Sequence, residues 1–424
     1  MRKKMRKLFT YGGSTIMKMS RIVALVLVIV SLLSCFVACG PKEEGKEKIE
    51  IWVSEKKGVK EFTRIQIEQF LAENPNYGYT IDDFVIEGVP EGDAASQVLL
   101  DVADAPDIYC FAQDQLARLV QASALAPLGQ TAAATITANN DAGSVGAVTV
   151  GGKLYAYPMT SDNGYYLYYD KTVVTDPTDL KKIVDDCVNA GAKFHFELEN
   201  GWYAASFFFG VGCHSIWKTD DDGNFIGIDD NFDDNALGVA AMKGIQIVTQ
   251  SDCYVNSSTV EGDYLAAIVT GTWNAEDADE YFGENLGVCK LPSFTVDGET
   301  YQLGSFSGFK LMGVKPQTDI AKAEFCSALA QYLTGEECQM ERFNEYQWGP
   351  SNKNAQANED VMNNPSLLAL KAQSPYAVAQ GYIPNEWWTS AAGLAKKAAT
   401  CATDDEIKTA LAAYRSEIEA VINK

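Results

Sequence analysis

The sequence is poor in the residues on which most enzyme chemistry depends. It contains only two histidines, His195 and His214, so a histidine metal site or a Ser-His-Asp triad has little to be built from. The motifs GxSxG, GxxxxGK(S/T) and HExxH are absent as well. Carboxylates are abundant, and a glycosidase pair stays open because the sequence does not give the separation of two carboxylates. We expect both histidines to be structural, and we expect no metal and no cofactor.

Basic residues are scarce after the first 39 positions. The chain has 34 Lys and Arg against 57 Asp and Glu, and residues 1–39 hold seven of the basic residues and no acidic one. The remainder therefore carries 27 basic and 57 acidic residues, a formal net charge of −30. So acidic a body repels nucleic acid, which excludes that partner and predicts a solvated surface.

The N-terminal segment has the order of an export signal. A basic start is followed by the apolar run Ile22–Cys39, and then by the polar stretch GPKEEGKEK. This order predicts a signal peptide at 1–39 and a flexible tether at 40–47, with a retained membrane helix as the alternative. The start is Met1, or the internal Met17 or Met19.

The end of the apolar run resembles a bacterial lipobox. The sequence FVACG places Cys39 after an alanine and before a glycine, and Cys35 is a second, weaker match. The resemblance predicts lipidation of Cys39, and two or more acyl chains anchor a protein stably. We expect a lipid-anchored protein on the extracellular face of the membrane of a Gram-positive bacterium.

The other cysteines have no CxxC or metal-ligand spacing. They are scattered singly in apolar segments, which favours small buried hydrophobes over metal ligands, and any pairing cannot be read from the sequence. They are Cys110, Cys187, Cys213, Cys253, Cys289, Cys326, Cys338 and Cys401.

The chain of 424 residues is long enough for two lobes, and its first part alternates strands with helices. Apolar spacing predicts a strand followed by a turn at 48–58, strands at 79–88 and 105–112, and helices at 59–75 and 94–102. Such a βαβαβ order implies parallel strands with helices on both faces.

The later segments predict further α/β structure. Residues 151–174 alternate aromatic residues, as in a hairpin or in crossing strands. The other expected elements are a hairpin at 217–229, helices at 235–250 and 319–335, strands at 264–273 and 303–314, and tail helices at 366–379 and 386–423.

Aromatic residues lie beside polar ones where several predicted strands end. Phe111 and Asp114 follow the third strand, Trp273 ends another, and Trp387 and Trp388 open the tail helix. Ligands of open α/β sheets bind beyond the carboxyl ends of the strands. Indole and phenol rings stack on the C–H faces of a sugar, and carboxylates and amides bind its hydroxyls. The pattern therefore predicts a sugar pocket.

Six segments of the chain, in their order, resemble the extracellular solute-binding proteins of ATP-driven sugar importers, the maltose/maltodextrin-binding group in particular. They are KIEIWVSEKKG, APDIYCFAQD, GGKLYAYPMTSDNGYYLYYDK, GTW, GVCKLPSF and IPNEWW. The resemblance covers nearly the whole mature chain. It implies an α/β, two-lobed periplasmic-binding-protein-like fold of type II, with a cleft between hinge-connected lobes. The lobes are expected at 48–158 plus 301–335 and at 159–300 plus 336–424.

The resemblance also implies a set of ligand-binding residues, and Trp388 is favoured over Trp387 as the ligand-facing ring. Gln115 departs from the family pattern, because maltose binders have an arginine there. The expected ligand-binding residues are Glu55, Lys56, Phe111, Asp114, Asp162, Asn163, Glu199, Trp202, Tyr203, Trp273, Trp387 and Trp388.

The resemblance implies a binding protein without enzymatic activity. We expect a monomer that captures an oligosaccharide, most often maltodextrin in this group, and delivers it to the transmembrane subunits of an ABC permease. The alternatives are a surface-anchored glycosidase, and the same fold with a different sugar or a small osmolyte as its ligand.

Overall fold

β1 (Ile49–Val53) is an inner strand of the first sheet, between β2 and β3, in the computed structural model, which describes residues 47–220 and 224–422. All elements below belong to the compact unit Ile49–Lys424. Residues 1–46, with the predicted signal and Cys39, lie outside the described residues. Within the described residues, no helix is both long and apolar enough to cross a bilayer.

The first sheet has the predicted parallel βαβαβ start. β2 and β3 flank β1 in parallel, and β16 continues the sheet antiparallel to β3. β16 also pairs with β6 and, in parallel, with β17. Besides β1, the strands of this sheet are β2 (Phe84–Gly88), β3 (Ile108–Ala112), β6 (Ala156–Gly164), β16 (Ser305–Val314) and β17 (Ala377–Ala379).

Helices cover both faces of the first sheet, as β3 illustrates. Ile108 and Cys110 belong to one hydrophobic core with α2 and α11, whereas Tyr109 and Phe111 belong to another core with α3 and α4. A parallel strand that is buried on both faces is continuously apolar for this reason. The helices around this sheet are α2 (Val59–Glu73), α3 (Ala94–Val98), α4 (Leu116–Gln121), α5 (Gln130–Asn139), α6 (Ala142–Ala147) and α11 (Ile320–Leu333).

The second sheet has the strand order β11-β8-β12-β7-β13. Its strands are β7 (Tyr166–Asp170), β8 (Lys193–His195), β11 (Tyr254–Val255), β12 (Leu265–Thr270) and β13 (Leu286–Cys289). The helices packed around it are α7 (Leu180–Ala190), α8 (Gly201–Gly210), α9 (Leu237–Thr249), α10 (Ala275–Phe282), α15 (Pro365–Gln373), α16 (Asn385–Thr400) and α17 (Asp404–Ile422).

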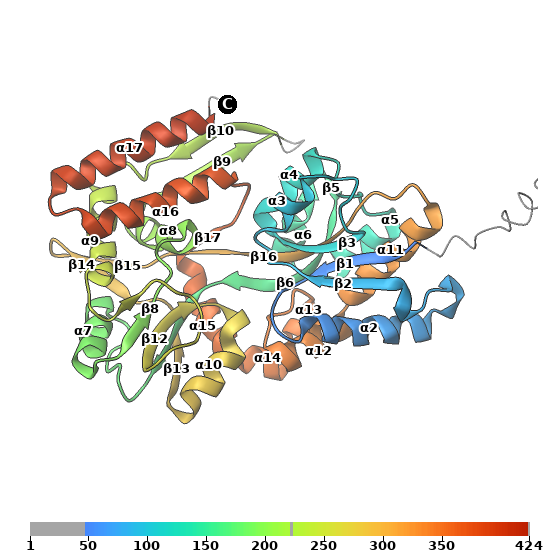
Figure 1. The fold of residues 1–424 in the computed structure, drawn as a ribbon, viewed down its shortest axis with the longest axis horizontal. Coiled ribbons are helices and arrows are strands. Elements are labelled where there is room, and N and C mark those ends of the chain that lie inside the picture. Colours follow the sequence, from blue (N-terminus) through green and yellow to red (C-terminus); the bar gives the residue numbers. More distant parts are fainter. Residues whose placement is uncertain (1–46, 221–223, 423–424) are drawn as a thin grey trace, which may run out of the picture. The chain divides into compact units, whose positions relative to one another are not determined.

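The aromatic stretch 151–174 contains crossing strands. Only one residue separates β6, in the first sheet, from β7, in the second. β6 lies against β16, and Figure 1 shows the two strands running between the two sheets. This pair therefore connects the two halves of the molecule.

The remaining elements are short. The two-stranded pairs are β4 (Thr149–Val150) with β5 (Lys153–Leu154), β9 (Ser215–Thr219) with β10 (Phe225–Asp230), and β14 (Ser293–Val296) with β15 (Glu299–Gln302). The other helices are α12 (Glu336–Tyr346), α13 (Lys353–Gln356) and α14 (Glu359–Asn363), with 3-10 turns η1 (Pro75–Tyr77), η2 (Ile81–Asp83), η3 (Gln113–Gln115), η4 (Thr272–Asn274), η5 (Gly283–Asn285) and η6 (Ser374–Tyr376).

The expected tail helices differ from the structure at two places. The first α-helix ends at Gln373, since Pro375 has no N–H group to continue the helical hydrogen bonds; the 3-10 turn η6 follows, and residues 377–379 form β17. β17 thus brings a late segment into the first sheet. The second expected helix is two helices, since the Glu406 carboxylate accepts hydrogen bonds from the Ala402 and Thr403 N–H groups and starts α17.

The predicted helix 94–102 is also shorter, because α3 ends at Val98. The cysteine prediction is confirmed: the eight cysteines of the described residues are free, and all but the half-buried Cys289 are buried. In the described ranges, no cluster of three or more His, Cys, Asp and Glu is arranged to hold a metal.

Candidate functional site

A cavity of 610 Å³, called the main cavity below, lies where strands of both sheets end. Ser54 follows β1, Glu91 follows β2, Asp114 follows β3, Trp273 follows β12, and Gln380 follows β17. Its lining residues are Ser54, Glu55, Lys56, Pro90, Glu91, Gly92, Asp93, Ser96, Ala112, Asp114, Asn163, Asn200, Trp202, Trp273, Asn274, Asp277, Lys310, Gln380, Asn385 and Trp388. The cavity therefore lies where ligands of open α/β sheets bind, beyond the carboxyl ends of the strands.

Three indoles line the main cavity. The rings of Trp202 and Trp273 lie 5.8 Å apart between centroids, with 43° between their planes. Trp388 packs edge-on against Phe306 at 5.4 Å and against Trp387 at 4.9 Å. The half-buried indoles thus offer apolar surface to a ligand, while neighbouring rings fix their orientation.

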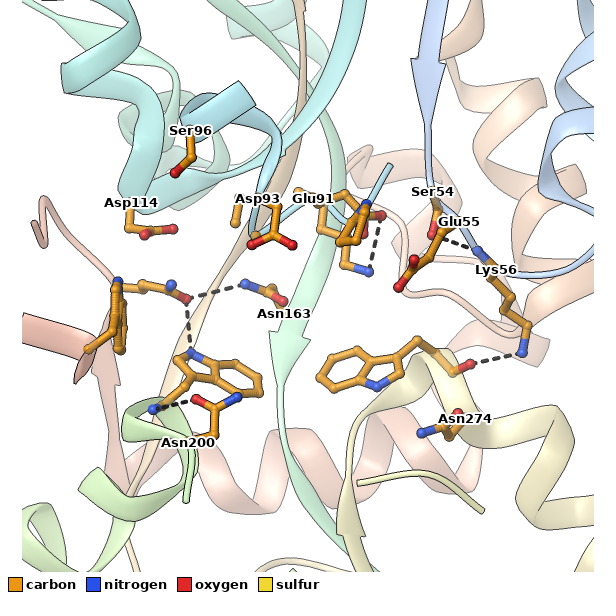
Figure 2. Close-up of a pocket in the computed structure, with 18 of the residues that line it drawn as sticks. Ser54, Glu55, Lys56, Glu91, Asp93, Ser96, Asp114, Asn163, Asn200 and Asn274 are labelled. Atoms are coloured by element: carbon orange, nitrogen blue, oxygen red, sulfur yellow. Dashed lines mark hydrogen bonds and ion pairs between the residues drawn. The ribbon is translucent and has the colours of Figure 1, made fainter. Parts of the chain in front are cut away.

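One buried amide orients several cavity side chains. The Gln380 Oε1 atom accepts hydrogen bonds from Trp202 Nε1 and from Asn163 Nδ2, both at 3.2 Å. Gln380 also hydrogen-bonds to Asp114. Figure 2 shows Asp93 and Asp114 on one side of the open space and Asn200 on the other. Polar groups that are held in this way are preorganised for a ligand.

Asp114 is the most perturbed carboxylate of the cavity. It is 5% exposed, and within the described residues its Oδ1 atom has no hydrogen-bond partner. Burial raises the pKa of Asp114 to about 7, although the nearby Arg118 and the hydrogen bond from Gln380 lower it. Asp114 lines the main cavity, so its carboxylate is an acceptor for a ligand hydroxyl group there.

Two lysines of the cavity lining contact Trp273. The Lys310 ammonium, in the middle of β16, lies 3.4 Å from Glu91 Oε1 and 5.3 Å from the centre of the Trp273 ring. Lys56 Nζ donates a 2.8 Å hydrogen bond to the Trp273 carbonyl and lies 3.4 Å from Asp277. Both lysines therefore position the segment that carries Trp273.

Seven of the residues expected to bind ligand line the main cavity. They are Glu55, Lys56, Asp114, Asn163, Trp202, Trp273 and Trp388.

The other five expected residues lie elsewhere, for identifiable reasons. Phe111, Tyr203 and Trp387 are buried in the hydrophobic cores. Asp162 points away from Asn163 because neighbours on a strand face opposite sides, and it accepts hydrogen bonds from Thr272 and from the Gly349 N–H group. Glu199 forms a 3.2 Å ion pair with Lys396.

Several lining residues were not expected from the sequence. Glu91 and Asp93 follow β2, so the strand-end rule that selected Asp114 would have found them too. Lys310 is the single charged residue of its strand, β16, which the sequence already shows. Gln115, the departure from the family pattern, is buried and bonds to Glu91 O at 2.8 Å, so it holds the loop that follows β2.

A second cavity, of 740 Å³, lies along β6 and β16 near α14 and α15. Its lining contains no tryptophan, and the side chains from α14 and α15 include Val361, Met362 and Leu368. It lacks the pairing of indoles with unpartnered carboxylate oxygens, so we regard the main cavity as the candidate site.

The two histidines make ordinary local contacts. His195 Nδ1 lies 3.0 Å from the Thr259 carbonyl, and burial lowers its pKa. His214 Nε2 lies 3.0 Å from the exposed Asp229. Neither residue lines the main cavity.

Two lobes of α/β structure, crossing strands and a cavity at the strand ends define the class of two-lobed solute-binding folds. The sequence agrees: the family model for bacterial extracellular solute-binding proteins matches residues 66–369, and the chain belongs to this family. Its members are binding proteins of the extracellular space. No sequence similarity to a curated protein is found.

Solved structures share the fold. One, determined with acarbose, has 27% identity and a TM-score of 0.77, and the match covers 89% of this chain and 100% of that one. The maltodextrin-binding protein MalE1 of L. casei BL23 has 22% identity and a TM-score of 0.70, covering 88% and 98%. The maltotriose-binding protein of Thermus thermophilus has 19% identity and a TM-score of 0.72, covering 88% and 100%.

Proposed function

We propose that the protein captures an oligosaccharide outside the cell and delivers it to the permease of an ABC importer, with maltodextrins as the first class to test. The observation that carries the proposal is the main cavity, which combines three indoles with carboxylates and amides. The names of the similar structures, which include acarbose, maltodextrin and maltotriose, support the same class of ligand.

The chemistry of the lining suits a sugar. Trp202, Trp273 and Trp388 present ring faces and edges on which the C–H faces of pyranose units stack. Asp114 and Asn163 present an acceptor and an amide to hydroxyl groups. Because a buried polar group that loses its partner is costly, this lining rejects ligands that lack the matching hydroxyls.

Capture proceeds by closure of two lobes, each built around one sheet, about β6 and β16. A ligand that contacts both lobes binds the closed form more tightly than the open form, so it shifts the population toward closure. The permease then recognises the closed form. No covalent step is required of any residue in this scheme.

The protein is held at the extracellular face of the cell membrane by acyl chains on Cys39. The test is metabolic labelling with a palmitate analogue in a bacterial host that acylates lipoproteins. Cys39→Ala should abolish labelling and release the protein, whereas the control Cys35→Ala should leave both unchanged. The reverse result would assign the anchor to Cys35, and labelling of neither cysteine would contradict anchoring.

Ligand binding is tested by titration calorimetry and intrinsic tryptophan fluorescence. Maltotriose is compared with fructo-, galacto- and xylo-oligosaccharides of similar length, and the sugars are analysed by chromatography after incubation. Micromolar binding of maltotriose with no change in chain length is the expected result. Shortened products would favour a glycosidase, and binding of another series alone would change the ligand class.

A further inference from the structure

Two sets of side-chain contacts join the two halves of the molecule at the edge of the main cavity. The first, the Lys56 clasp, consists of Lys56, Trp273, Glu276 and Asp277. The second, the Asn385 clasp, is described next. Both are made between protein groups directly, so neither requires a bridging ligand atom.

The Asn385 clasp uses both ends of one amide. Asn385 Nδ2 donates to Ser96 Oγ at 2.8 Å, and Asn385 Oδ1 accepts from Arg118 Nη1 at 2.8 Å. Ser96 lies in α3 and Arg118 in α4, and both helices contribute to a core around β3 of the first sheet. Asn385 is the first residue of α16, whose buried Trp387 belongs to the core of the other half.

The Lys56 clasp links the end of β1 to the segment after β12. Lys56 Nζ donates to the Trp273 carbonyl at 2.8 Å and lies 3.4 Å from Asp277 and 3.7 Å from Glu276. The Lys56 side chain is 15% exposed, whereas the two carboxylates are half exposed. An ion pair of this exposure is sensitive to salt.

We propose that these two clasps stabilise the closed cleft and thereby set the affinity for every ligand by a common factor. The inference rests on the proposed function and names positioning residues within it. Apparent affinity equals the intrinsic affinity of the closed form multiplied by the fraction of protein that is closed. A contact between lobes changes that fraction, and it does so equally for all ligands.

The common factor separates a clasp from a direct ligand contact. Ser96, Asn385 and Lys56 also line the cavity, so their removal weakens binding under either explanation. A direct contact with the ligand is made by some sugars and not by others, so its loss raises the dissociation constants of different sugars by different factors. A clasp leaves the ratios of the dissociation constants unchanged.

The experiment uses the compact unit Ile49–Lys424, which contains both sheets and the cores described above. Asn385→Ala is compared with Thr389→Ala, an exposed residue of the same helix. Lys56→Met is compared with Lys57→Met, the exposed neighbour that lies outside the cavity lining. Small-angle X-ray scattering of the protein alone gives the radius of gyration, and calorimetry gives Kd for several oligosaccharides.

Each clasp variant should increase the radius of gyration and should raise the Kd of every ligand by the same factor, about two- to tenfold. The control variants should change neither quantity. Ser96→Ala combined with Asn385→Ala should weaken binding no further than Asn385→Ala alone, because Asn385→Ala already removes the hydrogen bond that the two residues share. For Lys56→Met, the dependence of the radius on salt should also disappear.

An unchanged radius of gyration in both clasp variants would overturn the inference, and so would Kd factors that differ severalfold among ligands. If the wild-type protein binds no oligosaccharide, the proposed function fails by itself. The scattering comparison then still decides the clasps, because it requires only the protein.

Discussion

Raising the pH from about 6 to about 8 is expected to tighten ligand binding by about tenfold, because Asp114 changes its protonation state in this range. Burial raises the pKa of this carboxyl group to about 7. Asp114 lines the main cavity, and an ionised carboxylate accepts a hydrogen bond from a hydroxyl group more strongly than a neutral carboxyl group does. Binding therefore favours the ionised form.

The magnitude follows from the fraction of Asp114 that is ionised. If only this form binds, the apparent Kd is raised about elevenfold one pH unit below the pKa and only about 1.1-fold one unit above it. Calorimetry across this range, in buffers of different ionisation enthalpy, measures both the change in Kd and the proton released on binding.

Matched variants identify the responsible group. Asp114→Asn should remove the pH dependence, whereas Asp93→Asn, at an exposed carboxylate of the same cavity, should retain it. A Kd that is independent of pH in the wild-type protein, or tighter at low pH, would refute the reasoning. So would a pH dependence that survives in Asp114→Asn.

Three further predictions concern binding and stability. Trp273→Ala should weaken oligosaccharide binding by about 1–3 kcal/mol through loss of a stacking surface, and an unchanged Kd would contradict that role. Trp387→Phe should lower the free energy of unfolding by about 1–3 kcal/mol in urea, because the buried indole donates to the Tyr414 hydroxyl at 3.0 Å, and Trp388→Phe should cost less stability while changing Kd. Because the pKa of Asp114 is raised in the folded protein, the unliganded protein should lose stability as the pH rises from about 4 to about 7. In Asp114→Asn, the melting temperature should depend less on pH over this range, as thermal unfolding measures.

The adjacent tryptophans show what sequence patterns can and cannot predict. Side chains of neighbouring helical residues point about 100° apart, so one indole of the pair was expected to leave the core. Which one does so depends on contacts from other segments: Phe232 packs edge-on against Trp387, and the Tyr414 hydroxyl accepts a hydrogen bond from its indole. The sequence favoured Trp388 as the ligand-facing ring, but the reason that Trp387 stays in the core lies in these tertiary contacts.

At two other places, one residue lines the main cavity and its immediate neighbour in the sequence does not. The alternation along β6 sends Asn163 to the cavity and Asp162 to the opposite side, and the sequence resemblance by itself does not fix that register. In the same way, Asn200 lines the cavity and caps α8, while its neighbour Glu199 pairs with Lys396. The parallel strand order, by contrast, followed from local apolar spacing.

The lining of the main cavity also constrains how the protein matures. Ser54 follows the first described strand and Trp388 lies in the next-to-last helix, so the cavity is complete only after nearly the whole chain has been released and folded. A ligand stabilises only states in which its site exists. A ligand of this cavity therefore cannot assist the early stages of folding, and it stabilises only protein that has already brought both ends of the chain together.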